Sequence, residues 1–195
     1  MFKHAREFLR HIRNHKWERA GDGGLLIAPA NAVITNYYEH DLNGQDVQRD
    51  YNLLTVEGLT YLLTVGFYNG SKNASWYLSL YGGNYTPTSG LTQASYPATA
   101  SEITSNTEGY SETTRPAWTL AAPASGSATN VASKAAFTIA TASSVTIYGA
   151  ALHSESTKGG VTGVCASAKK FATARTAYNT DVFNLGYVTS ITSAD

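Results

Sequence analysis

Few residues of this 195-residue chain have the types and spacing that catalysis requires. The clearest group is His153-Ser154-Glu155, near the end of a predicted strand. A hydrolytic triad needs side chains that meet in space, whereas neighbouring side chains of a strand point to opposite faces. His153 and Glu155 would share one face, and Ser154 would point away. The group supports only a minor hypothesis, a hydrolase that uses His153 and Glu155.

The other reactive residue types do not form known motifs. His11 and His15 stand four residues apart, but no Glu lies between them in the zinc-protease arrangement. The glycines at 159–163 are not followed by the Lys-Ser/Thr pair of a phosphate-binding loop. Cys165, the only Cys, lies among small apolar residues, which predicts a buried side chain. We therefore expect no enzymatic activity, no metal site and no cofactor.

Composition narrows the classes of partner. The chain has 14 Lys+Arg and 14 Asp+Glu, and only 14% of its residues are charged, whereas about a quarter is usual. Ser, Thr, Asn and Gly fill the gap together with 13 Tyr, a mixture typical of strands and turns. No apolar stretch is long enough for a membrane helix, and the pattern of a signal peptide is missing. We expect neither nucleic acid nor a membrane as partner.

The first 24 residues are predicted to form a basic N-terminal arm. Residues 1–20 carry six Lys or Arg and two Glu, a net charge of +4, and the rest of the chain carries −4. An amphipathic helix is expected over 2–19, followed by a glycine-rich hinge. The apolar residues at helical spacing are Phe2, Ala5, Leu9 and Ile12.

This arm has two predicted roles, packing on its own body or docking on another surface, and the hinge favours docking on a neighbouring subunit. The residues expected to make apolar contacts with a partner are Phe8, Leu9, Ile12 and Trp17. The residues expected to steer the encounter electrostatically are Arg6, Arg10 and Arg13.

Residues 25–195 are predicted to form a mainly β body, a β-sandwich or jelly roll of roughly seven strands. One short helix is expected at about 54–65, with Thr55 as its N-cap. Leu59, Leu62 and Leu63 should form the buried stripe of this helix. Strands are expected at 33–38, 76–81, 116–122, 131–140, 145–152, 164–174 and 181–192.

A long, turn-rich stretch at 82–115 interrupts the strands. The residues predicted to hold the end of this stretch to the sheet are Tyr110, Arg115 and Trp118, with Arg115 in an Arg–Glu pair. The alternative is that these three side chains face a partner. Lys158, in a turn between two later strands, is expected to be exposed.

Three segments resemble small virion structural proteins of tailed bacteriophages, of the head decoration, or cement, type. The first segment runs from residues 52–55 to residues 76–78. The second is Tyr-Ser-Glu-x-x-Arg-Pro-x-Trp at 110–118, and the third is the two strands joined by Lys-Gly-Gly at 145–171. The resemblance leaves out the basic arm. It implies a β-rich body that self-associates as a dimer or trimer and binds the major capsid protein on the outer capsid surface, without an enzymatic step. Many modest contacts would then sum to a stable shell.

A second structural hypothesis is a phage tail or fibre component. In that case Trp76, Tyr81 and Tyr85 would form a carbohydrate-binding face.

Overall fold

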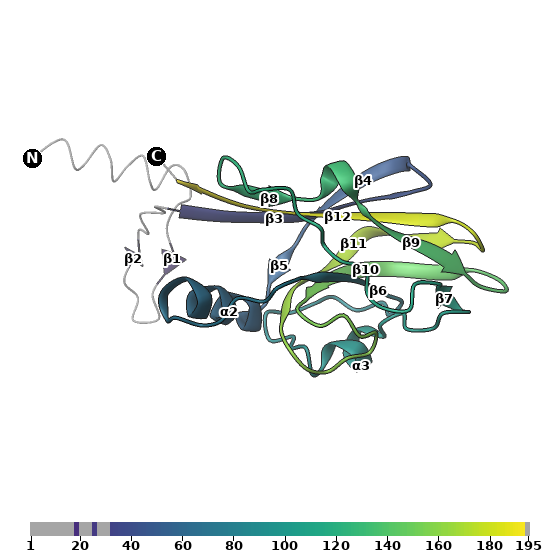
Figure 1. The fold of residues 1–195 in the computed structure, drawn as a ribbon, viewed down its shortest axis with the longest axis horizontal. Helices are drawn as coiled ribbons and strands as arrows, with labels where there is room; N and C mark the ends of the chain where they lie inside the picture. Colours follow the sequence, from purple (N-terminus) through teal and green to yellow (C-terminus); the bar gives the residue numbers. More distant parts are fainter. Residues whose placement is uncertain (1–17, 20–24, 27–31, 194–195) are drawn as a thin grey trace, which may run out of the picture. The chain divides into compact units, whose positions relative to one another are not determined.

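The computed structural model describes residues 18–19, 25–26 and 32–193 (Figure 1). It is mainly β, as predicted, and every strand pairing given below is antiparallel. The chain divides into two compact units, residues 1–33 with 191–195, and residues 34–190. In the first unit, β1 (Glu18–Arg19) pairs with β2 (Leu25–Leu26).

The predicted helix over 2–19 is wrong at its end, because Glu18–Arg19 is a strand. Pairing with Leu25–Leu26 supplies backbone partners across the intervening glycines, so local propensity does not decide these two residues. Residues 1–17 lie outside the described residues, and so do the arm positions Arg6, Phe8, Leu9, Arg10, Ile12, Arg13 and Trp17. Their roles stay predictions.

One sheet has six strands. Its order is β4 (Gln45–Tyr51), β3 (Ala32–Leu42), β12 (Val182–Ser193), β9 (Ala135–Ala140) and β7 (Gly109–Tyr110), and β8 (Ser127–Thr129) pairs with β12. A tight turn at Asn43-Gly44 joins β3 and β4, and both residues have positive φ, 54° and 76°. Positive φ at two central residues is the requirement of a tight hairpin turn.

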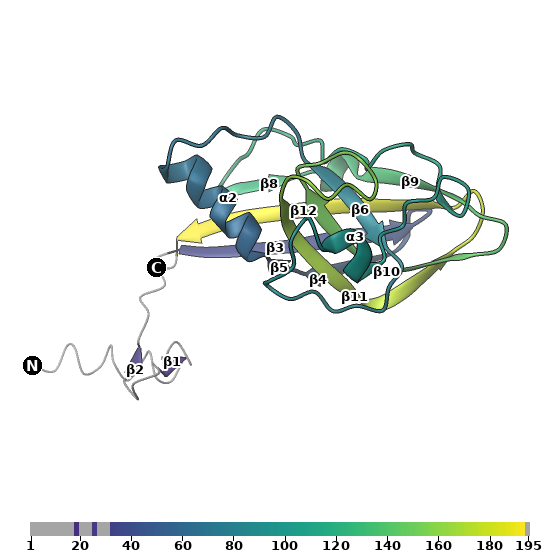
Figure 2. The ribbon, with the colours of Figure 1, turned by 90° about the horizontal axis from the view of Figure 1, so that it is seen from below.

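The second sheet has four strands, β5 (Leu53–Leu54), β11 (Cys165–Ala177), β10 (Val145–His153) and β6 (Tyr77–Tyr81) in that order. Side chains from both sheets form one apolar core, which includes Tyr38 and Phe183 from the first and Leu78 and Ile147 from the second. Figures 1 and 2 show the strands of the second sheet crossing beneath those of the first.

A second apolar cluster covers the other face of the four-stranded sheet. Its members are Tyr81, Leu91, Tyr96, Ala100, Ala151, Cys165 and Ala168. Tyr81, which the tail or fibre hypothesis places on a carbohydrate-binding face, is fully buried. The turn-rich stretch supplies this cover, because it contains α3 (Tyr96–Ala100), a helix that the sequence analysis missed.

The strand expected at 116–122 is not formed, and only Ala117 makes an isolated bridge, to Tyr77. Pro116 has no amide to donate, but its carbonyl accepts from the amide of Leu78 at 2.8 Å. Part of the strand expected at 131–140 is a short 3₁₀ helix, Val131–Ser133, which precedes β9.

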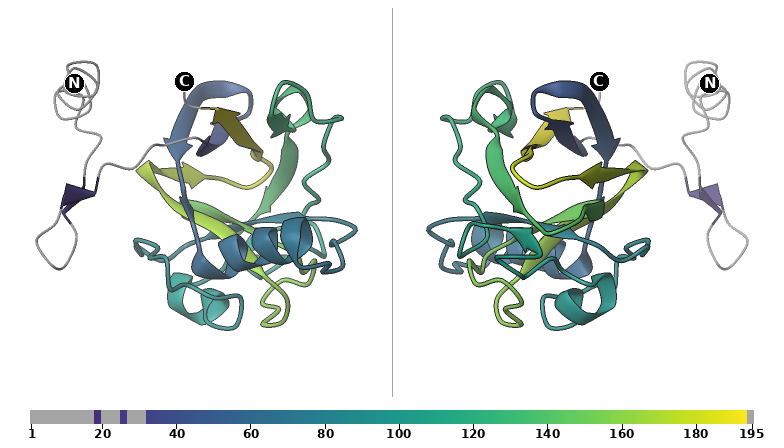
Figure 3. Two further views of the ribbon diagram at one scale, coloured as in Figure 1. Left: turned by 90° about the vertical axis from the view of Figure 1, so that its left-hand side faces the viewer. Right: turned by 90° about the vertical axis from the view of Figure 1, so that its right-hand side faces the viewer.

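Helix α2 (Val56–Phe67) confirms the one predicted helix, and the Thr55 side chain caps it by accepting from the amide of Gly58 at 2.9 Å. The predicted buried stripe is wrong, because Leu59, Leu62 and Leu63 are exposed. The helix packs against β11 through Gly58, which lies directly on the backbone of Ala166. Gly58 therefore makes the close contact with β11, and the three leucines stay exposed. Figure 3 shows the backbone of α2 running along the edge of the body.

Candidate functional site

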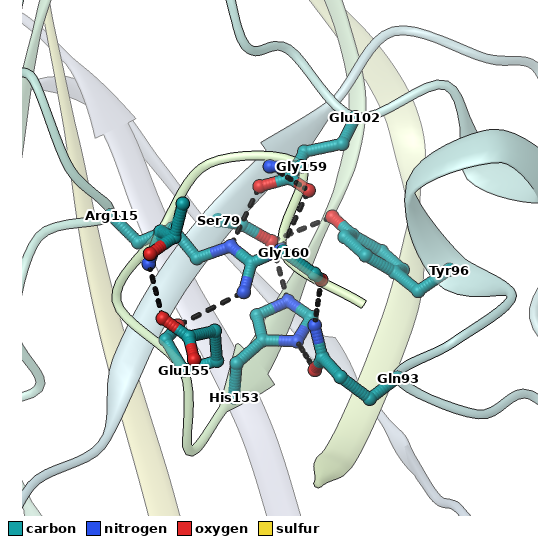
Figure 4. A network of polar contacts seen from close by, with 10 residues as sticks. Ser79, Gln93, Tyr96, Glu102, Arg115, His153, Glu155, Gly159 and Gly160 are labelled. Atoms are coloured by element: carbon teal, nitrogen blue, oxygen red, sulfur yellow. Dashed lines mark hydrogen bonds and ion pairs between the residues drawn. The ribbon is translucent and has the colours of Figure 1, made fainter. Parts of the chain in front are cut away.

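A network of polar side chains lies between the four-stranded sheet and the segments that cover it (Figure 4). Its members are Ser79 from β6, Gln93 and Tyr96 from the stretch around α3, Glu102, Arg115, and His153 from β10. All six side chains are buried. Because buried polar groups are stable only when paired, each contact within this network has a structural consequence.

Half of the network is a chain of hydrogen bonds through His153. Ser79 Oγ lies 2.7 Å from Nε2 of His153, and Gln93 Oε1 lies 2.7 Å from Nδ1. The amide nitrogen of Gln93 donates to the carbonyl of Gly160, so its oxygen faces the ring and accepts from Nδ1–H. Nε2 then accepts from Ser79, whose oxygen accepts from the Tyr96 hydroxyl at 2.6 Å.

The other half is an ion pair between Arg115 and Glu102. The Nε and Nη2 atoms of Arg115 each donate to one carboxylate oxygen at 2.7 Å, a bidentate geometry. Arg115 Nη1 also donates to the carbonyl of Glu155 at 2.9 Å, and the amide of Gly159 donates to Glu102 at 3.1 Å. The pair therefore ties the turn-rich stretch to the turn that follows β10.

The geometry around His153 has the order of a nucleophile, a base and an orienting group. Burial, with a smaller contribution from the charge of Arg115, lowers the pKa of His153 well below its usual value. Ser79 and His153 have no exposed surface, so a substrate cannot reach either atom without displacing the cover. In this conformation the arrangement is a structural network.

Glu155, the predicted partner of His153, is turned elsewhere. Its carboxylate accepts from the amide of Thr157 at 2.9 Å and from the hydroxyl of Thr162 at 3.3 Å. These bonds lower its pKa. Within the described residues no hydrogen bond joins Glu155 to His153, so the pairing on which the hydrolase hypothesis depends is not formed.

The residues predicted to hold the long stretch are interior. Tyr110 packs edge-on against Phe137, with ring centroids 4.9 Å apart, and Trp118 donates from Nε1 to the carbonyl of Tyr187 at 3.1 Å. Tyr110, Arg115 and Trp118 expose 0, 1 and 9% of their surface. They fix their segment to the body, and as interior side chains they do not form part of its outer surface.

Lys158 is half-buried rather than exposed, which corrects the prediction for this turn. Its Nζ lies 3.6 Å from the centroid of the Tyr110 ring and donates to the carbonyl of Tyr110 and to the side chain of Asn106. Burial lowers the pKa of Lys158 to about 8. The lysine thus covers Tyr110.

The proposed carbohydrate-binding face does not exist in this conformation. Tyr81 is fully buried, Tyr85 packs on the second apolar cluster, and Trp76 packs edge-on against Tyr61 with ring centroids 5.0 Å apart. The three aromatic side chains therefore do not share a solvent face, and Tyr81 is enclosed because both sides of β6 are covered.

The most unusual surface is the outer face of helix α2, defined as Val56, Leu59, Leu63 and Phe67. These side chains expose 56, 40, 60 and 89% of their surface. Their spacing of three, four and seven residues places them on one side of the helix. On the opposite side, Gly58, Tyr61 and Leu62 line a small apolar pocket of about 120 Å³ with Trp76 and Trp118. The helix is thus apolar on both sides, which is typical of a buried helix.

A second hollow is an open groove of about 520 Å³ beside β11. It is lined by Tyr51, Asn52, Leu53, Thr86, Pro87 and residues 168–172, which include Lys169 and Lys170. In the part of the chain that the structure covers, no three His, Cys, Asp or Glu side chains gather as metal ligands. Nor does any described helix have the length and apolar character needed to span a membrane.

The sequence alone did not predict the roles of Ser79, Gln93, Tyr96 and Glu102 or the exposure of the outer face of α2. For the helix a signal existed, since Glu57 is the only charged residue between Val56 and Phe67. For the network none did, because its members come from segments far apart in the chain. A scan against protein-family models matches no family, and a search of curated proteins finds no relative.

Proposed function

We propose that this chain is a non-enzymatic structural protein of a phage virion, a capsid cement protein that binds and stabilises the assembled shell of major capsid protein from outside. The resemblance of residues 52 onward to decoration proteins motivates the proposal. The two antiparallel sheets with a shared core would then be a β-sandwich of the jelly-roll type.

The observation that carries this proposal is the outer face of α2. Large contiguous apolar surfaces on soluble proteins mark interaction sites, and four neighbouring apolar side chains here expose two fifths or more of their surface. A protein that works by association needs such a surface and a body that does not deform. The buried bidentate pair of Arg115 and Glu102 supports the second requirement.

The interior position of His153 also supports a role without a reaction. A catalytic base must reach its substrate, and this imidazole is enclosed by Ser79, Gln93 and Tyr96. The proposed role therefore assigns the network to stability.

The basic arm would add contacts to an acidic patch of the shell or to a neighbouring cement subunit. Arg6, Arg10 and Arg13 would accelerate attachment electrostatically, and Phe8, Leu9, Ile12 and Trp17 would then pack. A full-length variant with R6E, R10E and R13E should attach more slowly than the parent, and the difference should shrink at high salt. Equal attachment rates at low salt would remove the arm from the mechanism.

The proposal is tested on virions of the phage that carries this sequence. Quantitative mass spectrometry of purified particles should give a copy number comparable to that of the major capsid protein. Particles stripped of the chain should lose resistance to heat and regain it when the purified chain is added back. A copy number of only a few per particle would favour the tail or fibre alternative, and absence from the particles would refute a virion role.

A further inference from the structure

We propose that two copies of this chain pair through the outer face of α2, about a two-fold axis that passes near Leu63. The pairing gives the proposed cement role its self-association, and in that sense it rests on that role.

The charge of the helix suits self-pairing. Glu57, its only charged residue, is turned inward, where it accepts from the amides of Gln93 at 2.8 Å and Cys165 at 2.7 Å. The outer face itself has no charge. A two-fold interface brings each surface against its own copy, so any charge near the axis would meet a like charge. A partner of opposite charge would instead be selected by charged side chains, which this face does not offer.

The exposed apolar side chains can form the centre of a dimer interface. Phe67 exposes 89% of its surface. Since an aromatic side chain buries about 150–250 Å², Phe67 alone offers on the order of 150 Å². A standard interface takes about 800 Å² from each partner. Val56, Leu59 and Leu63 extend the same surface, so that the four side chains supply a substantial part of this area.

The spacing of the apolar residues gives the pairing a defined register. Leu59 and Phe67 lie four residues on either side of Leu63 on the face, so a two-fold axis near Leu63 sets Leu59 of one copy close to Phe67 of the other. Thr60 and Gly66 flank this line, and a Cβ built on Gly66 would meet no atom within 4 Å. Small flanking residues allow two helices to approach to the usual separation of about 8–10 Å.

The first experiment measures the mass of the full-length chain in solution by sedimentation equilibrium over a wide concentration range. We expect twice the mass of one chain, which is 20.8 kDa. L63D should weaken the pairing by about a hundredfold or more, because it places two carboxylates at the axis. The matched control is V47D, on β4, where Val47 is 54% exposed. A monomer at all concentrations, a trimer, or a dimer that L63D leaves intact would overturn the inference.

The second experiment introduces a new cysteine. It is possible because the only cysteine of the parent chain, Cys165, is buried. L63C should form an intermolecular disulfide under mild oxidation, since a residue near a two-fold axis meets its own copy at bonding distance. V47C should remain reduced. The pairing is refuted if the L63C chain stays a reduced monomer and its new thiol does not react with a thiol reagent. If adding L9D and I12D to the full-length L63C chain then makes this thiol reactive, the arm covers α2. A dimer in solution with a protein absent from virions would refute the proposed function alone.

Discussion

Arg115 holds both carboxylate oxygens of Glu102 at 2.7 Å, and neither side chain has any exposed surface. The two residues are thirteen positions apart on the turn-rich stretch, and Arg115 also donates to two carbonyls of the turn after β10. Burial opposes the charge of Arg115, but the bonds to Glu102 outweigh this effect and leave its pKa raised. The charge of Arg115 is therefore kept, and the loops that cover the second sheet are held by one buried pair.

Replacing Arg115 by Met should destabilise the body by about 3–5 kcal/mol, because the change leaves the Glu102 carboxylate buried without its charged partner and with only the amide of Gly159 to donate to it. Urea denaturation measures the free energy of unfolding. The matched control is R49M, since Arg49 bonds Glu39 at the same 2.7 Å but is 62% exposed. That change should cost about 1 kcal/mol or less.

A second replacement separates the pair from its surroundings. The double variant R115M with E102L removes both charges and should be more stable than R115M alone, because an apolar pair avoids the unpaired carboxylate. Equal stabilities of the single and double variants would show that Glu102 is not the residue left unpaired.

The sequence predicts that Arg115 holds the long stretch to the sheet through an Arg–Glu pair, and the structure has such a pair. The sequence does not identify Glu102 as the partner, because thirteen residues of irregular chain give no periodic rule for which carboxylate returns to the guanidinium. Helix α2 shows the same limit. Its N-cap at Thr55 is a local property and was predictable, whereas the side that faces the sheet is set by the contact of Gly58 with Ala166, which is more than a hundred residues away.

The strands divide in the same way. Alternation of residue types predicted β10 and β11, because one face of each packs on a core and the other was expected to be polar. It failed to predict that Tyr81 is buried, since both faces of β6 are covered by segments that have no period of their own.

Stability should fall as the pH decreases through the range in which histidine titrates. Burial keeps His153 neutral in the folded chain, whereas the unfolded chain takes up a proton below about pH 6.5. The contribution is fully present above that pH and is lost below it, by about 1.4 kcal/mol per pH unit for one such histidine. His40, whose pKa burial also lowers, adds an effect of the same sign.

H153Q tests this origin of the pH dependence. Gln does not titrate and can still contact Ser79 and Gln93. Unfolding free energies measured between about pH 7 and pH 5, above the range of ordinary carboxylates, should fall less steeply for H153Q than for the parent chain. An unchanged slope would mean that His153 is protonated in the folded protein or is not enclosed.

Cys165 should be unreactive in the folded chain. Burial raises the pKa of its thiol to about 12, and the side chain has no exposed surface. Since the thiolate is the reactive form, a thiol reagent at neutral pH should label the protein only as fast as it unfolds. Stopped-flow labelling should therefore give a rate that rises with denaturant and matches the unfolding rate. Fast labelling of the native chain would show that β11 opens locally.

Two glycines of α2 should respond to alanine in opposite directions. Gly66 is exposed and has open space around it, so G66A should stabilise the body by about 0.5–1 kcal/mol through helix propensity. Gly58 lies on the backbone of Ala166, and an added methyl group would overlap the carbonyl there. A backbone carbonyl cannot rotate away as a side chain does, so the helix must shift. The shift should cost more stability than the higher helix propensity of Ala adds, and G58A should lower the free energy of unfolding by about 1–3 kcal/mol overall. Urea denaturation of both variants gives the two signs, and a G58A chain as stable as the parent would mean that the helix does not press on β11 as closely as described.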